Sequence, residues 1–442
     1  MLVFPHRKLL ARSRSHWLSR PLHSDPRLNR SWLCLQIVLA TVMFSPVLAA
    51  PFSLWIVWEV WRKQWRQLCR SGFNRGLAVV SVLLILSAVL AENPGEAALG
   101  LFNFLPFFLI FVTISPLLQT PHQLRRIAWI LVFTSIPIIA IGFGQLFWGW
   151  SGPVRLLWSA IDWPLDPGGA PLGRMASVFA YANVLANYLA VTFTLALGLW
   201  IEAIDKTRYP WVSREVWGLS GVVLGNAIAL ILTNSRNAWA IALLVSLAFA
   251  VYLGWRWLIA ALGAVGAAIG GAAFAPAPIN QALRAVVPAY FWARLTDQLY
   301  PDRPFAQLRA TQWQFAWEMM QQRPLLGWGL RNFTPIYQAQ MDYWVGHPHN
   351  LFLMLLAETG LPATLLFCTL VGWIVGRAVW HWHHWDRKKS GQLIGLTFLL
   401  AFGGFTLFHL FDVTIFDARV NYLGWVLLAS LRGVIVWRDR SV

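Results

Sequence analysis

Long apolar runs alternate with short polar and basic segments along most of this chain. Several of the runs hold about 18–25 apolar residues, and about 20 suffice for a helix to cross the hydrocarbon core of a bilayer. Apolar and polar residues do not alternate within the runs in the way that marks the strands of a membrane β-barrel. We therefore predict an all-α, polytopic integral membrane protein.

The positions of the runs predict about twelve transmembrane helices. Residues 32–61 are too long for one ordinary span and are interrupted at Ser45, Pro46 and Pro51, so we predict two short spans that form a hairpin there. The predicted spans are 32–45, 47–61, 73–91, 99–118, 127–149, 175–201, 216–233, 238–254, 257–275, 362–380, 391–411 and 419–437.

The same pattern divides the chain into four segments. They are a basic tail (1–31), a bundle of about nine spans (32–275), a polar segment (276–345), and a C-terminal region (346–442) with a re-entrant helix and the last three spans. We expect the polar segment to form one large loop that contains amphipathic helices. It carries two helix-like pieces, 279–299, interrupted by Pro288, and 305–322.

The second helix-like piece mixes Trp313, Phe315 and Trp317 with glutamines and arginines. Aromatic rings are favoured at the membrane interface, so this piece suits a helix that rests there. A helix that merely caps the bundle explains the pattern equally well.

Charge sets the orientation that we expect. Hydrophobic residues make up 58% of the chain and charged ones 12%, about half the share in ordinary soluble domains. With loops assigned to alternating sides, every lysine falls on the side of both termini, which carries a net charge of +18 while the other side carries −1. Cytoplasmic loops collect Lys and Arg, which predicts cytoplasmic termini in the plasma (inner) membrane and a periplasmic 276–345 loop.

The basic balance thus reflects orientation and contact with anionic lipid headgroups, and we expect no nucleic-acid partner. We see no cleavable signal peptide, because the first apolar run begins near Ser31 after a long basic leader. Cys34, Cys69 and Cys368 lie in or beside spans without metal-ligand spacing. We assign them structural roles and predict no metal and no cofactor.

The segment 346–350 (GHPHN) and the apolar run after it gather most of the candidate chemistry. His347, His349 and Asn350 stand there, and Glu358 follows. Gly360 and the proline two residues later are typical of a helix stop and a new helix start. We predict a short helix over 348–359 and a second, membrane-spanning one over 362–380.

Other ionisable residues also lie at the outer ends of spans, whereas a charge at the bilayer centre would be costly. Arg174 opens the 175–201 span, Arg236 lies in the short 233–237 turn, and the last outer turn holds His409, Asp412, Asp417 and Arg419. Alternatives exist for each. An arginine at a helix end often only reaches to the headgroups, a histidine beside proline often caps a helix, and Glu358 could pair with an outer arginine.

The last outer turn is typical of a structural set of ion pairs. Asn183 and Asn187 share one helix face and suit interhelical hydrogen bonds. His349 and Glu358 stand nine residues apart, which puts them on opposite faces of a helix about 13 Å apart along its axis. They are therefore not a direct acid–base pair.

Two arginines and a histidine instead suit an anionic substrate. Arginine binds phosphate in a fork, and a neutral histidine can take a proton from a hydroxyl. The chain has no P-loop, dinucleotide fingerprint, zinc spacing or Gly-x-Ser-x-Gly elbow. We expect an outer-face site for a phosphate carried by a lipid.

These residues also resemble a known signature. The run 323–333 (RPLLGWGLRNF) and the block from His349-Asn350 to Glu358-Thr359-Gly360 resemble motifs of the O-antigen ligase/polymerase superfamily (Wzy-C, WaaL-like). The turn at Arg236 and the stretch from Arg174 to Asn183 fit its upstream blocks. Within the superfamily the chain most resembles the cyanobacterial branch called IctB, which is named for inorganic carbon (bicarbonate) transport.

The resemblance implies a metal-independent membrane glycosyltransferase of the GT-C type. Such a ligase or polymerase moves a glycan from undecaprenyl pyrophosphate to a hydroxyl of an acceptor glycan. His349 would be the base, Arg174 and Arg236 would hold the pyrophosphate, and Glu358 would orient the first helix or an arginine. Further candidates for substrate binding are His347, Asn350 and Arg331. The branch name implies the alternative, a bicarbonate transporter or an accessory factor for inorganic carbon accumulation.

Overall fold

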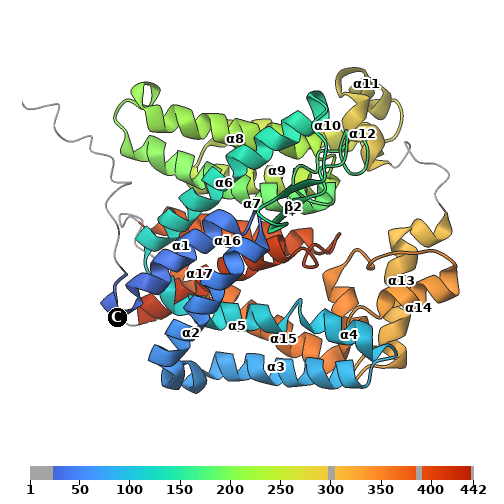
Figure 1. The fold of residues 1–442 in the computed structure, drawn as a ribbon. Coiled ribbons are helices and arrows are strands. Elements are labelled where there is room, and N and C mark those ends of the chain that lie inside the picture. Colours follow the sequence, from blue (N-terminus) through green and yellow to red (C-terminus); the bar gives the residue numbers. More distant parts are fainter. Residues whose placement is uncertain (1–22, 297–303, 385–390, 440–442) are drawn as a thin grey trace, which may run out of the picture.

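The structure, a computed structural model, describes residues 23–296, 304–384 and 391–439 and is built almost entirely of helices (Figure 1). Residues 1–22 of the predicted basic tail lie outside the described residues. The elements up to residue 163 are η1 (Pro26–Leu28), α1 (Asn29–Thr41), α2 (Pro46–Arg70), α3 (Gly72–Val89), α4 (Pro94–Leu101), α5 (Leu105–Ile114), η2 (Ser115–Leu117), α6 (Pro121–Phe147), β1 (Val154–Leu156) and β2 (Ile161–Trp163).

The rest of the chain adds the helices that enclose the candidate site. They are α7 (Ala182–Lys206), η3 (Pro210–Val212), α8 (Arg214–Leu232), α9 (Arg236–Leu253), α10 (Arg256–Phe274), α11 (Ile279–Val286), α12 (Ala289–Leu295), η4 (Phe305–Gln307), α13 (Arg309–Gln322), α14 (Phe333–Met341), α15 (Leu351–His383), α16 (Gln392–Phe408) and α17 (Ala418–Asp439).

The chain is a polytopic α-helical membrane protein. Among the described residues, eight helical segments are long and apolar enough to cross a bilayer: 72–89, 94–117, 121–147, 182–206, 214–232, 236–253, 256–274 and 351–383. α16 is apolar but has 17 residues. α1 has 13 residues, about 20 Å of helix, which is shorter than the roughly 30 Å hydrocarbon core. The predicted count of twelve spans therefore stays a prediction.

Several predicted spans differ in detail from the helices observed. The interruption predicted at Pro51 is absent, because Pro51 lies inside α2, which continues to Arg70. The helix expected from residue 175 begins only at Ala182, because residues 175–181 form an irregular segment in which Ser177 has a positive φ. The span expected over 99–118 is interrupted between α4 and α5, just before Pro106. In the latter two places polar residues or proline interrupt the helix although the apolar run continues in the sequence.

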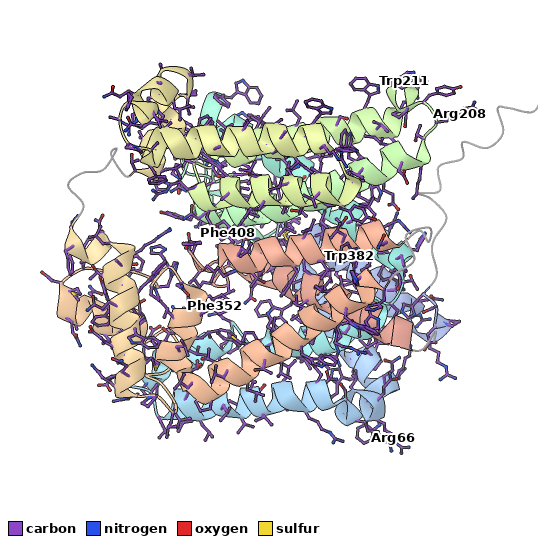
Figure 2. All side chains as sticks on the ribbon, turned by 180° about the vertical axis from the view of Figure 1, so that it is seen from behind. Arg66, Arg208, Trp211, Phe352, Trp382 and Phe408 are labelled. Carbon is purple, nitrogen blue, oxygen red and sulfur yellow. The ribbon has the colours of Figure 1, made fainter. Side chains whose placement is uncertain are left out.

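The helix connections fall at two ends of the bundle. One end, which we call the long-loop end, holds the connections 42–45, 90–93, 148–181, 233–235, 275–296, 304–350 and 409–417. The opposite end holds the connections 71, 118–120, 207–213 and 254–255. In Figure 2, Arg66 and Arg208 lie at the opposite end, and α13 stands at the long-loop end.

α7 lies at the centre of the bundle and packs against α6, α8, α9 and α16. Polar side chains connect it to its neighbours. The Thr192 hydroxyl donates to Asn226 Oδ1 on α8 over 2.7 Å, and Asn226 Nδ2 donates to Ser135 Oγ on α6 over 3.2 Å. In a bundle where lipid is as apolar as the side chains, such bonds and close packing hold helices together.

Two small units cover the long-loop end. β1 and β2 form an antiparallel hairpin, and the Trp163 indole N–H donates to the Phe44 carbonyl between α1 and α2 over 2.9 Å. α13 and α14 pack on the start of α15 through Phe315, Phe333 and Tyr337. Phe315 is thus buried in a cap on the bundle, which favours the cap explanation of the 305–322 piece over an interfacial one.

Candidate active site

α15 consists of two helical pieces joined at Gly360. The helix starts after Asn350, whose side-chain oxygen accepts hydrogen bonds from the N–H groups of Phe352 and Leu353. At Gly360 the backbone has φ 76° and ψ 173°, a conformation that other residues rarely adopt. The break falls where the glycine and the following proline predict it, so the short first piece presents its N-terminus to the long-loop end.

The 323–333 run wraps around this break. The Trp328 N–H donates to the Ala357 carbonyl over 3.0 Å, and the Gly329 N–H donates to the Glu358 carbonyl over 2.8 Å. Gly327 has φ 67°, and a Cβ there would lie 2.4 Å from the Glu358 backbone carbon. Only glycine fits, so the two motifs that resemble the ligase signature form one structural unit.

The Glu358 side chain belongs to this unit, and the catalytic role predicted for it stays a prediction. It is 2% exposed, and its Oε1 accepts a hydrogen bond from the Phe333 N–H over 3.1 Å. Its Oε2 has no hydrogen-bond partner among the described residues, and no described arginine forms an ion pair with it. Glu358 therefore fixes the start of α14 against α15, which is a positioning contact.

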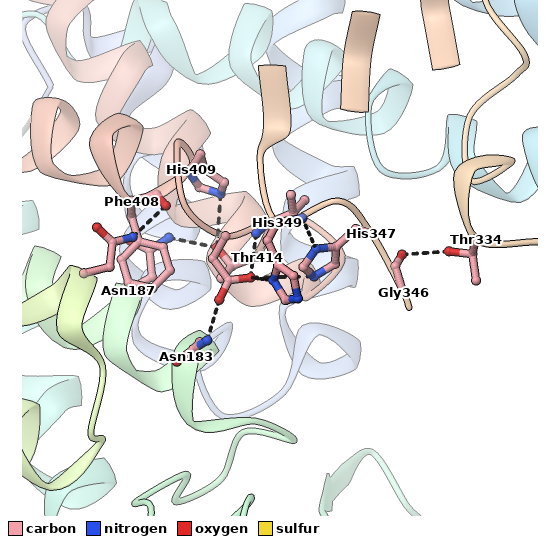
Figure 3. Close-up of polar contacts among 12 residues, drawn as sticks. Asn183, Asn187, Thr334, Gly346, His347, His349, Phe408, His409 and Thr414 are labelled. Carbon is pink, nitrogen blue, oxygen red and sulfur yellow. Dashed lines mark hydrogen bonds and ion pairs between the residues drawn. The ribbon is translucent and has the colours of Figure 1, made fainter. Parts of the chain in front are cut away.

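His349 instead meets Asp412, in the connection between α16 and α17. His349 Nδ1 lies 3.2 Å from Asp412 Oδ1, and His347 Nε2 lies 3.7 Å from the same oxygen. Figure 3 shows the two imidazoles side by side, with Asn183 approaching the carboxylate from the other side. The Leu351 N–H donates to the His409 carbonyl over 2.9 Å, which brings the start of α15 to the end of α16.

The hydrogen bonds define which nitrogen of each neutral imidazole carries its proton. A carboxylate only accepts hydrogen bonds, so Nδ1 of His349 donates to Asp412 and Nε2 of His349 is left as a lone-pair nitrogen. His347 Nδ1 accepts from the His349 backbone N–H over 3.1 Å, so the proton of His347 sits on Nε2 and faces Asp412. A neutral His349 can therefore accept a proton at Nε2.

Asp412 also connects His349 to an arginine. Asn183 Nδ2 donates to Asp412 Oδ2, and Asn183 Oδ1 accepts from Arg174 Nη2. Arg174 Nε in turn donates to the Thr233 carbonyl over 2.8 Å. The structure thus places the predicted base and one predicted phosphate-binding arginine at the two ends of a single hydrogen-bonded chain.

Arg236 lies next to this chain. It is the first residue of α9 and follows the turn whose Thr233 carbonyl holds Arg174. Asn237 donates from Nδ2 to the Phe408 carbonyl over 2.8 Å, which ties the start of α9 to the end of α16. The 233–237 turn, Arg174 and the histidine pair therefore converge at the long-loop end.

Two further predicted residues have other contacts. Arg331, with φ 61°, pairs with Glu96 at 3.4 Å, and both side chains are nearly half exposed. The Asn350 side-chain oxygen caps α15. Whether either residue binds substrate stays a prediction.

Asp412 and Arg309 are the residues that the sequence analysis missed. We expected Asp412 in a structural ion-pair set with Asp417 and Arg419. Asp417 and Arg419 do pair, with Arg419 Nε 3.0 Å from Asp417 Oδ1, but Asp412 turns to the histidines. Arg309 opens α13, and its charge acts on His347 and Asp412. The sequence does hold a signal that could have identified Asp412, which is a carboxylate that stands between apolar residues in the 409–416 turn.

Burial and charge set the protonation of the cluster. Burial lowers the pKa of His347 to about 4, and the positive charges of His349 and Arg309 act in the same direction. Burial by itself would raise the pKa of Asp412, but the hydrogen bond from His349 and the neighbouring positive charges hold that pKa well below its usual range. At neutral pH Asp412 is therefore a carboxylate and His347 is neutral.

His409 closes the cluster on the side of α16. Its Nδ1 lies 2.8 Å from the Phe405 carbonyl and therefore carries the proton, so its Nε2 accepts from the Thr414 hydroxyl over 3.1 Å. Asn187 Nδ2 donates to the same hydroxyl over 2.8 Å, so Asn187 connects α7 to the 409–417 connection and not, as predicted, to another helix. Burial lowers the pKa of His409 to about 4, in agreement with a neutral ring.

The same three side chains have the chemistry of a cation site. The ligand atoms of His347, His349 and Asp412 lie within 4.8 Å of one another, and imidazole nitrogen with carboxylate oxygen suits zinc. The atoms that would bind a cation are those that form the His349–Asp412 hydrogen bond. The set can therefore serve as a hydrogen-bonded pair or as a cation site, but not as both at once.

A family model for O-antigen ligases, Wzy_C, matches residues 221–368. The match runs from α8 into α15 and includes Arg236, the 323–333 run and both site histidines. A search of curated proteins found no match. The match and the fold together support a multi-pass membrane protein with an O-antigen ligase domain, and so the superfamily that the motifs resemble. The IctB branch stays a prediction.

Proposed function

We propose that this protein is a membrane glycosyltransferase that moves a glycan from undecaprenyl pyrophosphate to a hydroxyl of an acceptor glycan. The observation that carries the proposal is the hydrogen bond from His349 Nδ1 to Asp412, which leaves Nε2 of His349 as a base. The ligase-family match over the same region supports it.

His349 acts first in the proposed reaction. Its Nε2 takes the proton of the acceptor hydroxyl as the oxygen forms a bond to the anomeric carbon of the donor glycan. Asp412 fixes the imidazole in the useful tautomer and stabilises the imidazolium that forms, as the carboxylate of a catalytic triad does. Base catalysis of this kind contributes roughly 10²–10⁴-fold to the rate.

The arginines act on the leaving group. The bond between the anomeric carbon and the pyrophosphate oxygen breaks, and the electron pair leaves with undecaprenyl pyrophosphate. In the proposal Arg174 and Arg236 bind its phosphates, which is supported by their positions on either side of the 233–235 turn, and Arg309 of α13 adds a third positive charge near the histidines. Guanidinium groups bind phosphate oxygens in pairs, so the charge that develops on the leaving group is stabilised without a metal ion.

The proposal places the long-loop end outside the inner membrane, with both termini in the cytoplasm. The distribution of basic residues supports this orientation, because Lys63 and Lys206, the lysines within the described residues, both lie toward the opposite end, and cytoplasmic ends of spans collect lysine and arginine. A lipid-linked donor presents its pyrophosphate at the membrane surface, which is where the histidine cluster lies relative to α7, α15 and α16.

The test uses one preparation of protein in liposomes and two assays. One assay follows turnover of an undecaprenyl-pyrophosphate glycan, and the other follows uptake of labelled bicarbonate. We expect glycan turnover that His349→Ala abolishes and that His384→Ala, a histidine at the opposite end, leaves intact. Bicarbonate uptake that survives His349→Ala, without glycan turnover, would favour the transport alternative and overturn the proposal.

A chelator distinguishes the hydrogen-bonded pair from a cation site. We expect EDTA to leave glycan turnover unchanged. Loss of turnover with EDTA and its return with added zinc would make His347, His349 and Asp412 metal ligands instead.

A further inference from the structure

A cavity of about 130 Å³, lined by both apolar and polar residues, lies at the end of the bundle opposite His349. It is enclosed by the end of α2, the start of α3, η2 and the second half of α17. Arg432, on its wall, is fourteen residues beyond Ala418 at the start of α17, which corresponds to about 21 Å along the helix. The cavity is therefore separate from the histidine cluster.

Arg432 is the cation of this cavity. Its Nη1 donates to Asn74 Oδ1 over 2.7 Å and its Nη2 donates to Ser71 Oγ over 2.9 Å. The guanidinium lies 4.7 Å from the Phe73 ring centre and 5.3 Å from that of Phe111. These contacts hold the side chain in place but leave its charge without an anionic partner.

The charge of Arg432 has no counterion among the described residues. No described carboxylate pairs with it, and none lines the cavity. A guanidinium offers five N–H donors, and the two bonds to Asn74 and Ser71 use two of them. Arg432 is partly buried, and a charge that is partly removed from water favours an anionic partner, so the cavity can accept an anion.

The rest of the lining favours an oxyanion. Gln67 and Gln119 add side-chain amides, and Ser71 and Ser115 add hydroxyls. The volume is several times the roughly 10–15 Å³ that one water needs, which leaves room for a group of phosphate size. Arg66, Arg70 and Arg75 are exposed nearby on α2 and α3, and such basic segments attract anionic headgroups.

We propose that this cavity binds a phosphate group, with Arg432 as its charged donor and Gln67 and Gln119 as neutral donors. The phosphate can belong to the headgroup of an anionic phospholipid or to a free phosphate ion, since both present the same oxygens. Phosphate in this cavity joins α2, α3, η2 and α17, so we expect it to stabilise the fold. The site does not depend on the proposed glycan transfer.

The experiment compares thermal unfolding of detergent-purified, delipidated full-length protein with and without phosphate-bearing probes. The probes are phosphatidylglycerol and inorganic phosphate, with chloride at equal ionic strength as the blank. Arg432→Gln removes the charge, and Gln67→Glu places a carboxylate at the exposed rim that neutralises Arg432 in place. Arg208→Gln, which changes an exposed arginine at the same end of the bundle but outside the cavity lining, is the matched control.

We expect phosphatidylglycerol or phosphate to raise the unfolding temperature of the wild type and of Arg208→Gln. Both cavity variants should bind the effective probe roughly tenfold or more weakly, because charged hydrogen bonds are lost or neutralised. A response to phosphatidylglycerol alone identifies a lipid headgroup, and a response to inorganic phosphate as well identifies a free-anion site.

Equal responses of the wild type and Gln67→Glu to both probes would overturn the proposal. Gln67→Glu tests phosphate binding even if Arg432→Gln does not fold. Gln67 is exposed and its side chain makes no described hydrogen bond, so we expect this variant to fold. The unfolding temperature of His349→Ala should respond to the probes as that of the wild type does. A failure of the phosphate proposal is therefore distinguishable from a failure of the proposed glycan transfer.

Discussion

Asp412 Oδ1 lies 3.2 Å from Nδ1 of His349, a residue 63 positions earlier in the chain. One residue opens α15 and the other follows α16, and the two meet because the Leu351 N–H binds the His409 carbonyl. A base and the carboxylate that orients it therefore come from two separate connections, 304–350 and 409–417, which the packing of the last three helices brings together.

Asp412→Asn should nearly abolish glycan transfer while the protein still folds. An amide N–H in place of a carboxylate oxygen would favour the tautomer of His349 with its proton on Nε2, which cannot accept another. We expect a loss of roughly 10²–10⁴-fold in kcat, measured by turnover of a lipid-linked glycan in liposomes. Asp417→Asn, in the same turn but paired with Arg419, is the matched control for turnover. Unchanged kcat in a folded Asp412→Asn protein would remove Asp412 from the mechanism.

Arg174→Lys should weaken the binding of the lipid-linked donor more than it slows the reaction of the donor that is bound. Lysine keeps the positive charge but lacks the fork that binds two phosphate oxygens. It also cannot keep both the bond to Asn183 and the bond to Thr233 in the present geometry. We expect a rise in KM for the donor of about tenfold, determined from initial rates. An unaltered KM would show that Arg174 only supports the turn.

Gly327→Ala should destabilise the protein, because alanine at φ 67° is strained by about 1–2 kcal/mol and its Cβ would meet the Glu358 backbone. Gly372→Ala lies in the same helix as Glu358 with nothing within 4 Å of its added Cβ, and it should be neutral or mildly stabilising. Thermal unfolding in detergent measures both. Equal unfolding temperatures for the two variants would contradict the close packing of the 323–333 run on α15.

Acid should destabilise the fold through the buried histidines. An unfolded His409 takes a proton below about pH 6.5, whereas the folded one does so only near its lowered pKa of about 4. The unfolded state thus binds more protons between these values, and stability falls as the pH falls. The loss for His409 is on the order of 2 kcal/mol at pH 5.

Unfolding temperatures from pH 7.5 to 5 test this expectation. His347 acts in the same direction, so the wild type should lose stability steadily with acid. The depressed pKa of Asp412 adds to the loss only below its ordinary value of about 3.8, outside this pH range. His409→Gln should show a shallower slope, and His384→Gln, exposed at the opposite end, should keep the wild-type slope. A slope that His409→Gln leaves unchanged would show that His409 is not neutral in the folded protein.

The hydrophobic pattern predicted most helices to within a few residues, because apolar runs and helix-breaking residues act locally. It failed where polar contacts override the run, as at residues 175–181, where Gln145 Oε1 accepts from the N–H groups of Ala176 and Ser177. α14 was missed because its sequence carries Pro335 and no long apolar stretch. The β1–β2 hairpin is too short for its pattern to be visible.

The candidate site was predictable only in part, for a physical reason. Arg174, Arg236 and His349 could be proposed together because all stand at outer ends of spans. Their link through Asn183 and Asp412 depends on which connections pack together, and sequence spacing does not encode that. Asn183 suited interhelical bonding as well as Asn187 did, and only the fold distinguishes the residue that contacts the carboxylate from the one that contacts Thr414.

The central claim is that Nε2 of His349 accepts the proton of the acceptor hydroxyl. The most direct measurement is turnover of an undecaprenyl-pyrophosphate glycan by His349→Ala in liposomes, with and without added imidazole. We predict that the variant is inactive, that it folds, and that imidazole restores part of its turnover. Wild-type turnover by His349→Ala without imidazole would contradict the account.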